Sequence, residues 1–177
     1  MRDIELKLLA ELMKNSHRSD RELARTLGSS QPTITRIRNR LEKEGIIKEY
    51  TMVPDFFKLG YTLMGLTFVT LKKGLDIKEI QKAREAGKNA LEEVPCPVIM
   101  SERGRGLGYD GMMIILCKNY AEYIDCMRCI ENLSYIEGSR VESFLVSLED
   151  EVRYLPITFR VLVKHVAMLK GKEEKKA

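Results

Sequence analysis

The sequence has no tryptophan and only two histidines, His17 and His165, which lie far apart in the chain. Any aromatic stacking must therefore come from tyrosine and phenylalanine, and the side chain that most often serves as a general base is scarce. No H-E-x-x-H, P-loop or paired-carboxylate motif is present. These absences argue against an enzyme, and we predict no catalytic residues, no metal site and no cofactor.

Long apolar runs are also missing. No stretch approaches the roughly 18 apolar residues that a membrane span needs. The chain begins Met-Arg-Asp-Ile-Glu, with acidic residues where a signal peptide has its apolar run. We therefore predict a cytoplasmic protein that does not bind membranes.

Cysteine is present at four positions, Cys96, Cys117, Cys126 and Cys129. In a cytoplasmic protein we expect reduced thiols rather than disulfides. The C-x-x-C of Cys126 and Cys129 has no second pair to complete a zinc ribbon, and it lies too late in its predicted helix for a thioredoxin-type motif. Thiols packed in or near the core are favoured, and a thiol- or metal-responsive sensor using Cys126 and Cys129 is the alternative function.

Positive charge is modest overall but unevenly distributed. The 177 residues include 30 Lys+Arg and 26 Asp+Glu, and 44% of them are hydrophobic. These values are typical of one globular domain or two small ones, and they exclude a protein whose whole surface coats nucleic acid. Residues 1–60 hold 12 basic and 9 acidic side chains, whereas the remainder holds 18 and 17. The excess is concentrated in residues 31–48, with five basic side chains against two acidic ones.

Three short helices are predicted in this basic part. Asp3 is a plausible N-cap for a first helix to about Lys14. Ser19 and Glu22 form a capping box for a second, which ends at Gly28. A third helix follows, capped by Ser29 or Ser30, with Pro32 in its first turn and Gly45 at its end. Its predicted buried stripe is Ile34, Ile37 and Leu41. The β-branched residues of Ile46–Thr51 predict a short strand pair, so the order is that of a winged helix-turn-helix.

The remaining face of the third helix suits DNA recognition. It carries Gln31, Thr33, Thr35, Arg36, Arg38, Asn39 and Arg40. Arginine can bind guanine in the major groove, glutamine and asparagine can pair with adenine, and a threonine methyl can contact thymine. Residues near the start of such a helix reach bases and later arginines meet phosphates. We predict base contacts from Gln31, Thr33, Thr35 and Arg36, and phosphate contacts from Arg38 and Arg40. The alternatives are an ordinary solvated face or a protein-binding winged helix.

The second half predicts a different domain. Strands are expected at 63–71, 98–103, 112–117 and 141–148, and helices at 76–93 and 119–132. The order β-α-β-β-α-β is the ferredoxin-like arrangement, so the chain is of the α+β class. Helices cover one face of such a sheet, and we expect the other face to form a homodimer. The predicted domains are 1–60, 61–148 and a C-terminal extension, 149–177, with a helix after Pro156 and a disordered basic tail.

Glycines gather between two of these strands. Residues 106–111 spell a literal G-x-G-x-x-G, but a dinucleotide-binding fingerprint must open a helix, and Met-Met-Ile-Ile-Leu follows. We therefore predict a hairpin loop. Two functional alternatives are binding of a small carboxylate or phosphate by backbone N–H groups, and an enzyme that uses this loop.

Three segments together resemble the Lrp/AsnC transcription regulators: Asp3-Ile-Glu-Leu-Lys-Leu-Leu, Ser19-Asp-Arg-Glu-Leu-Ala, and the run from Gln31 to Thr51. The C-terminal element order and Gly108-Tyr-Asp110 before an apolar strand are similar to that family's sensing domain. The resemblance covers residues 3–148. It implies double-stranded DNA as a partner, a homodimer joined through the sheets, higher even-numbered oligomers, and sensing of a small-molecule effector, typically an amino acid. By position, the effector site carries over to Ser101, Gly104, Gly106, Gly108, Tyr109 and Asp110.

Overall fold

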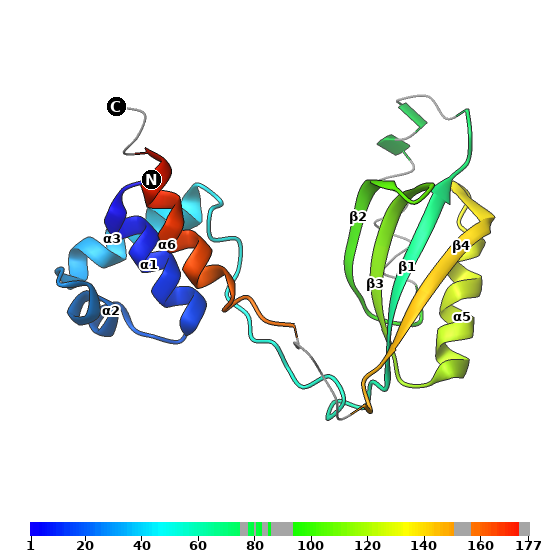
Figure 1. The fold of residues 1–177 in the computed structure, drawn as a ribbon, viewed down its shortest axis with the longest axis horizontal. Coiled ribbons are helices and arrows are strands. Elements are labelled where there is room, and N and C mark those ends of the chain that lie inside the picture. Colours follow the sequence, from blue (N-terminus) through cyan, green and yellow to red (C-terminus); the bar gives the residue numbers. More distant parts are fainter. Residues whose placement is uncertain (75–77, 80, 83–84, 86–93, 151–156, 174–177) are drawn as a thin grey trace. The chain divides into compact units, whose positions relative to one another are not determined.

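The computed structural model describes residues 1–74, 78–79, 81–82, 85, 94–150 and 157–173. The chain divides into two compact units. One combines Met1–Val53 with Tyr154–Ala177, and the other is Pro54–Arg153. The predicted boundaries at residues 60 and 148 stay predictions. Figure 1 shows the helices and strands of each unit.

Three helices form the N-terminal part: α1 (Asp3–Lys14), α2 (Asp20–Leu27) and α3 (Gln31–Lys43). The capping box at Ser19 is present, and Gly28 ends α2 with a φ of 61°, a backbone conformation that glycine adopts without strain. Ser30 caps α3, and the predicted stripe of Ile34, Ile37 and Leu41 is almost fully buried. The predicted helices are confirmed, except that Arg2, not Asp3, is the N-cap of α1.

The predicted strand pair at Ile46–Thr51 is wrong. Residues 44–62, all described, contain no strand. The N–H groups of Ile46 and Ile47 donate to the Leu41 carbonyl at 2.9 and 3.1 Å, so this backbone closes the end of α3. A β-branched run becomes a strand only when a second run lies beside it, and residues 56–60 form turns instead.

A fourth helix, α6 (Leu162–Glu173), joins this unit from the other end of the chain. It lies beside α1, where Val166 packs against the core of the three-helix cluster (Figure 1). The helix predicted after Pro156 is thereby confirmed. The predicted disordered tail is helical to Glu173, and residues 174–177 lie outside the described part of the chain.

The second unit is built on a four-stranded antiparallel sheet in the order β2-β3-β1-β4. Its strands are β1 (Leu63–Leu71), β2 (Val98–Gly106), β3 (Tyr109–Cys117) and β4 (Ile136–Ser147). Helix α5 (Tyr120–Glu131), capped by Asn119, packs on one face. The ferredoxin-like prediction is confirmed. The helix predicted at 76–93 falls mostly outside the described residues, although residues 78–79, 81–82 and 85 are helical.

The two faces of the sheet are lined by alternate residues of each strand. On the α5 side, Ile115, Cys126 and Ile130 are fully buried. On the other side the strand register aligns Met100, Ile114, Leu66 and Phe144 in one apolar row across all four strands. Phe144 in that row is 66% exposed. This second face is therefore apolar and open in the single chain.

The prediction that all cysteines are reduced is wrong. Cys96 and Cys126 form a disulfide, with their Cα atoms 6.1 Å apart. The fold packs the segment before β2 against α5, a contact between residues 30 positions apart that spacing in the sequence does not reveal. Cys117 is a buried free thiol, and its burial raises its pKa to about 11, while Cys129 is exposed.

Gly138 in β4 is expected to tolerate no side chain. A Cβ atom at this position would lie 2.8 Å from the Glu131 carbonyl oxygen, a backbone atom that cannot rotate away. Gly138→Ala should lower the free energy of unfolding of this unit by about 1–3 kcal/mol, measured by urea denaturation. Gly104→Ala is the matched control, because a Cβ there meets nothing within 4 Å. Equal stability of the two variants would contradict this close contact.

Candidate nucleic-acid interface

The outer face of α3 presents a group of exposed polar side chains. Gln31, Arg36 and Asn39 are exposed, and together with Pro32 and Thr35 they line a shallow surface depression. Their spacing of three to five residues places them on one side of the helix. Among the described residues, no carboxylate pairs with Arg36. These side chains are therefore available to a partner.

The threonines predicted to contact bases are engaged inside the protein through their hydroxyls. Thr33 Oγ1 lies 2.8 Å from Ser30 Oγ, at the helix cap. Thr35 Oγ1 donates to Asp20 Oδ2 at 2.6 Å and to the Gln31 carbonyl at 3.1 Å. Both side chains are half-buried. Their predicted role in base contacts is untested, and the geometry gives it less support than it gives Arg36.

The two arginines predicted to contact phosphates are ion-paired within the unit. Arg38 Nε lies 3.0 Å from Asp20 Oδ1, and both side chains are less than one-fifth exposed. Arg40 pairs with Glu5 of α1, and its Nε lies 3.7 Å from Glu44. Their predicted phosphate contacts remain predictions, and forming them requires these pairs to open or share their donors.

Three residues around Arg38 were not predicted: Asp20, Arg18 and Tyr50. Arg38 donates to the Arg18 carbonyl at 3.2 Å, and its guanidinium lies 5.7 Å from the centre of the Tyr50 ring. The Tyr50 hydroxyl donates to Glu42 at 2.7 Å, and burial together with this bond raises the pKa of Tyr50 to about 12. An acidic residue is ordinary in the first turn of a helix, so Asp20 carried no distinguishing signal in the sequence.

Glu5 connects α1 to α3 at this interface. It is only 3% exposed, and its carboxylate binds Arg2 and Arg40. Burial alone acts to raise the pKa of Glu5, but the hydrogen bonds from Arg2 and Arg40 outweigh it and lower the pKa to about 2. The carboxylate therefore stays charged and holds α1 against α3.

Because the pKa of Glu5 is lower in the folded chain, its contribution to stability exists above the usual pKa of 4.5 and disappears as the pH falls towards 2. Glu5→Gln should destabilise this unit by about 2 kcal/mol at pH 7 and by much less near pH 2, measured by urea denaturation. Glu44→Gln, at a half-exposed site, is the control. A loss for Glu5→Gln that is the same at both pH values would show that the charge is not responsible.

Only some of the residues predicted to bind an effector lie close together. Leu107 and Gly108, with φ of 53° and 84°, form the turn of the β2–β3 hairpin, which confirms the predicted loop. Gly106, Tyr109 and Asp110 adjoin this turn. Ser101 pairs with Met113, and five residues of strand put it about 17 Å from Gly106, with Gly104 between them.

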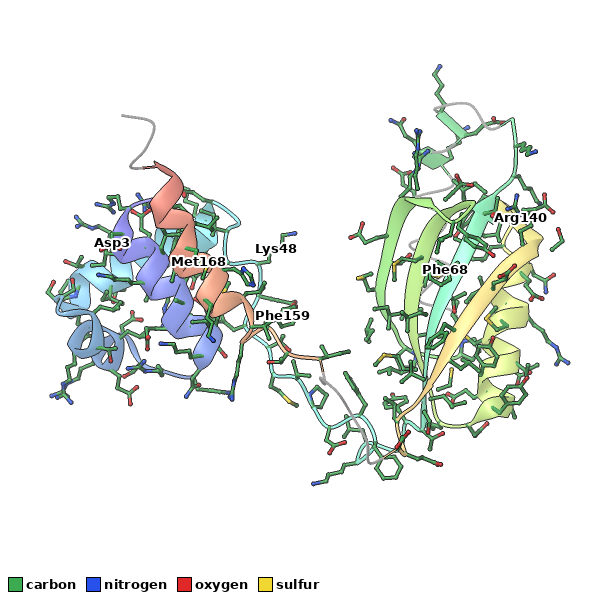
Figure 2. The ribbon with its side chains drawn as sticks, viewed as in Figure 1. Asp3, Lys48, Phe68, Arg140, Phe159 and Met168 are labelled. Carbon is green, nitrogen blue, oxygen red and sulfur yellow. A yellow bond between two sulfur atoms is a disulfide. The ribbon has the colours of Figure 1, made fainter. Side chains whose placement is uncertain are left out.

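Three of these residues, Gly108, Tyr109 and Asp110, already have structural partners. Asp110 Oδ2 accepts a hydrogen bond from the Leu71 N–H at 3.0 Å, and the Gly108 carbonyl accepts one from Arg140 at 3.1 Å. The Tyr109 ring is tilted against that of Phe68, with ring centres 5.5 Å apart, and its hydrogen bond to Glu142, together with burial, raises the pKa of Tyr109. Phe68 and Arg140 are labelled in Figure 2. These contacts hold the hairpin end on the open face of the sheet.

The structure excludes a dithiol site at the C-x-x-C motif of Cys126 and Cys129. Cys126 is buried and bonded to Cys96, whereas Cys129 is exposed on α5. Within the described part of the chain, no group of three or more His, Cys, Asp or Glu side chains could hold a metal ion. None of the helices in that part has the length and hydrophobicity that crossing a bilayer requires.

Helices α2 and α3 form a helix-turn-helix, which a ferredoxin-like sheet follows in the chain. The winged helix-turn-helix DNA-binding family matches residues 1–48. The transcriptional regulator LrpC of Bacillus subtilis is 41% identical over 69 residues, 39% of this chain, and the chain spans about half (48%) of its length. The transcriptional regulator FL11 of Pyrococcus furiosus is 24% identical over 88% of this chain and 95% of its own.

A solved structure shares the whole fold. The transcriptional regulator NMB0573 of Neisseria meningitidis, in complex with L-Met, superposes with a TM-score of 0.74 at 16% identity, over 94% of this chain and 99% of its own. The chain is therefore similar to the transcriptional regulators LrpC and FL11 in sequence and to this solved structure in fold.

Proposed function

We propose that this protein is a sequence-specific DNA-binding transcriptional regulator, located in the cytoplasm, that reads the major groove with α3. The observation that carries this proposal is the exposed face of Gln31, Arg36 and Asn39 on the second helix of a helix-turn-helix, where no carboxylate of the described residues pairs with Arg36. Arginine binds guanine O6 and N7, and the two amides suit adenine. The neighbouring basic side chains that are already ion-paired add little to non-specific attraction.

The regulator works as a homodimer that brings two α3 helices to one operator. The open sheet face supports this assembly, because its apolar row leaves Met100 and Phe144 exposed in a single chain, with Leu66 and Ile114 partly buried between them. Pairing two such faces about a twofold axis buries both rows. Two recognition helices then reach half-sites about one helical turn apart, roughly 34 Å.

A small-molecule effector, typically an amino acid, is proposed to act on assembly of the dimers. The relative from Neisseria was solved with L-Met, and the hairpin end holds Gly106, Gly108, Tyr109 and Asp110 close together. Ligand binding at this site shifts the oligomeric state only if one oligomeric state binds the ligand more tightly than the other. Thermal unfolding with each amino acid in turn tests this, and a shift that Tyr109→Ala abolishes would support it.

Selection of genomic DNA fragments by the purified full-length protein, followed by footprinting, tests the main function. We expect enrichment of a motif with two related half-sites whose centres lie about 10–11 base pairs, or a multiple of this, apart. The genes next to the enriched sites then indicate the effector class. Retention of all fragments alike, at every salt concentration, would contradict sequence-specific binding.

A further inference from the structure

Asp20 binds α3 at two points. It is the first residue of α2, and its carboxylate accepts the Thr35 hydroxyl at 2.6 Å while its other oxygen lies 3.0 Å from Arg38 Nε. Thr35 and Arg38 are three positions apart and lie on neighbouring turns of α3. One side chain on the first helix of the motif therefore fixes the rotation of the second.

Arg38 is enclosed on three sides. Asp20 Oδ1 lies 3.0 Å from its Nε as an ion pair without hydrogen-bond geometry, the Arg18 carbonyl accepts from its Nη2, and the Tyr50 ring lies 5.7 Å from its guanidinium. Its side chain is 19% exposed, whereas Arg36, two residues earlier, is exposed and pairs with no carboxylate among the described residues. Arg36 and Arg38 lie on the same helix, but only the Arg36 side chain is available to a partner.

The pairing removes one positive charge from the DNA-facing side of the unit. Each arginine that neutralises a phosphate releases counterions and steepens the dependence of affinity on salt, without reading the base sequence. An arginine held by a carboxylate contributes to neither effect until the pair opens. Such a pair therefore lowers the affinity for non-specific DNA most.

We propose that Asp20 is a positioning and specificity-determining residue for DNA binding, which withholds Arg38 from the phosphates and so limits non-specific affinity. This inference rests on the proposed DNA-binding function. Gln31, Arg36 and Asn39 then carry the recognition, and Arg38 serves to fix α3 against α2. Asp20 acts through Arg38 and Thr35 and touches no base itself.

The test compares the salt dependence of binding to a mixed-sequence DNA duplex of about three helical turns. Asp20→Asn keeps an acceptor for Thr35 but loses the charge that holds Arg38. We expect the slope of log affinity against log salt to steepen by about 0.9 for each bound α3, which makes the affinity loss from 50 to 200 mM salt roughly 3.5-fold larger per helix. A variant that merely failed to fold would bind less and show no steeper slope.

Three further variants assign the effect to Arg38. Arg38→Gln alone should keep the wild-type slope, and the double variant Asp20→Asn with Arg38→Gln should return to it. Glu49→Gln, which removes an exposed carboxylate from the same unit, controls for net charge. A wild-type slope in Asp20→Asn, or a double variant as steep as Asp20→Asn, overturns the inference. If the wild-type protein binds no duplex at all, the proposed function falls with it.

Discussion

Phe144→Glu is expected to convert the proposed homodimer into monomers at micromolar protein concentrations. Phe144 is 66% exposed in the single chain and lies in the apolar row that crosses the open sheet face. A carboxylate there would be buried without a partner when two faces meet. We expect a loss of about 3 kcal/mol or more in dimer stability, roughly a hundredfold rise in the dissociation constant, measured by analytical ultracentrifugation.

Tyr120→Glu provides the matched control for this variant. Tyr120 is an aromatic side chain with 61% exposure, and it belongs to α5 on the opposite side of the sheet. The control should keep the wild-type dimer constant and bind an operator with two half-sites normally. A Phe144→Glu protein that remains dimeric at the same concentrations would show that the open face is not the dimer interface.

Arg36→Ala is expected to weaken operator binding by about 1–3 kcal/mol and to relax the sequence requirement at one operator position. The reason is that Arg36 is the arginine of α3 that the structure leaves exposed and free of carboxylates among the described residues. Binding to unrelated DNA should change far less. Affinities for the selected operator, and for its single-base variants, measure both effects.

Arg128→Ala is the control for the lost charge, because Arg128 is an exposed arginine of α5 in the other unit. Its operator affinity should stay close to that of the wild type. If Arg36→Ala binds the operator as tightly as the wild type, α3 does not dock through this face.

Local signals in the sequence were sufficient for the N-terminal helices. Ser19 with Glu22, and Ser30 before Pro32, mark the starts of helices. Every residue that forms each of these caps lies within four positions of the sequence. The four strands were also predicted, because their apolar runs alternate with helical patterns. The predicted strand pair after α3 was wrong because pairing requires a second strand beside the first. The backbone N–H groups of Ile46 and Ile47 donate to the Leu41 carbonyl instead.

The candidate interface was predicted by its composition, but its internal pairings were not. Sequence periodicity places Arg36, Arg38 and Arg40 on α3, yet it does not show that Asp20 and Glu5 come from other helices to neutralise two of them. The disulfide between Cys96 and Cys126 escaped prediction for the same reason. Contacts between residues distant in the sequence exist only once the helices and strands have packed.

Helix α6 has a consequence for how the protein is made. The unit that carries α3 draws on both ends of the chain, because Val166 packs into the core formed by α1, α2 and α3. A ribosome releases α1, α2 and α3 before the sheet and α6 after it. The unit that carries α3 therefore reaches its full core only after α6 has emerged.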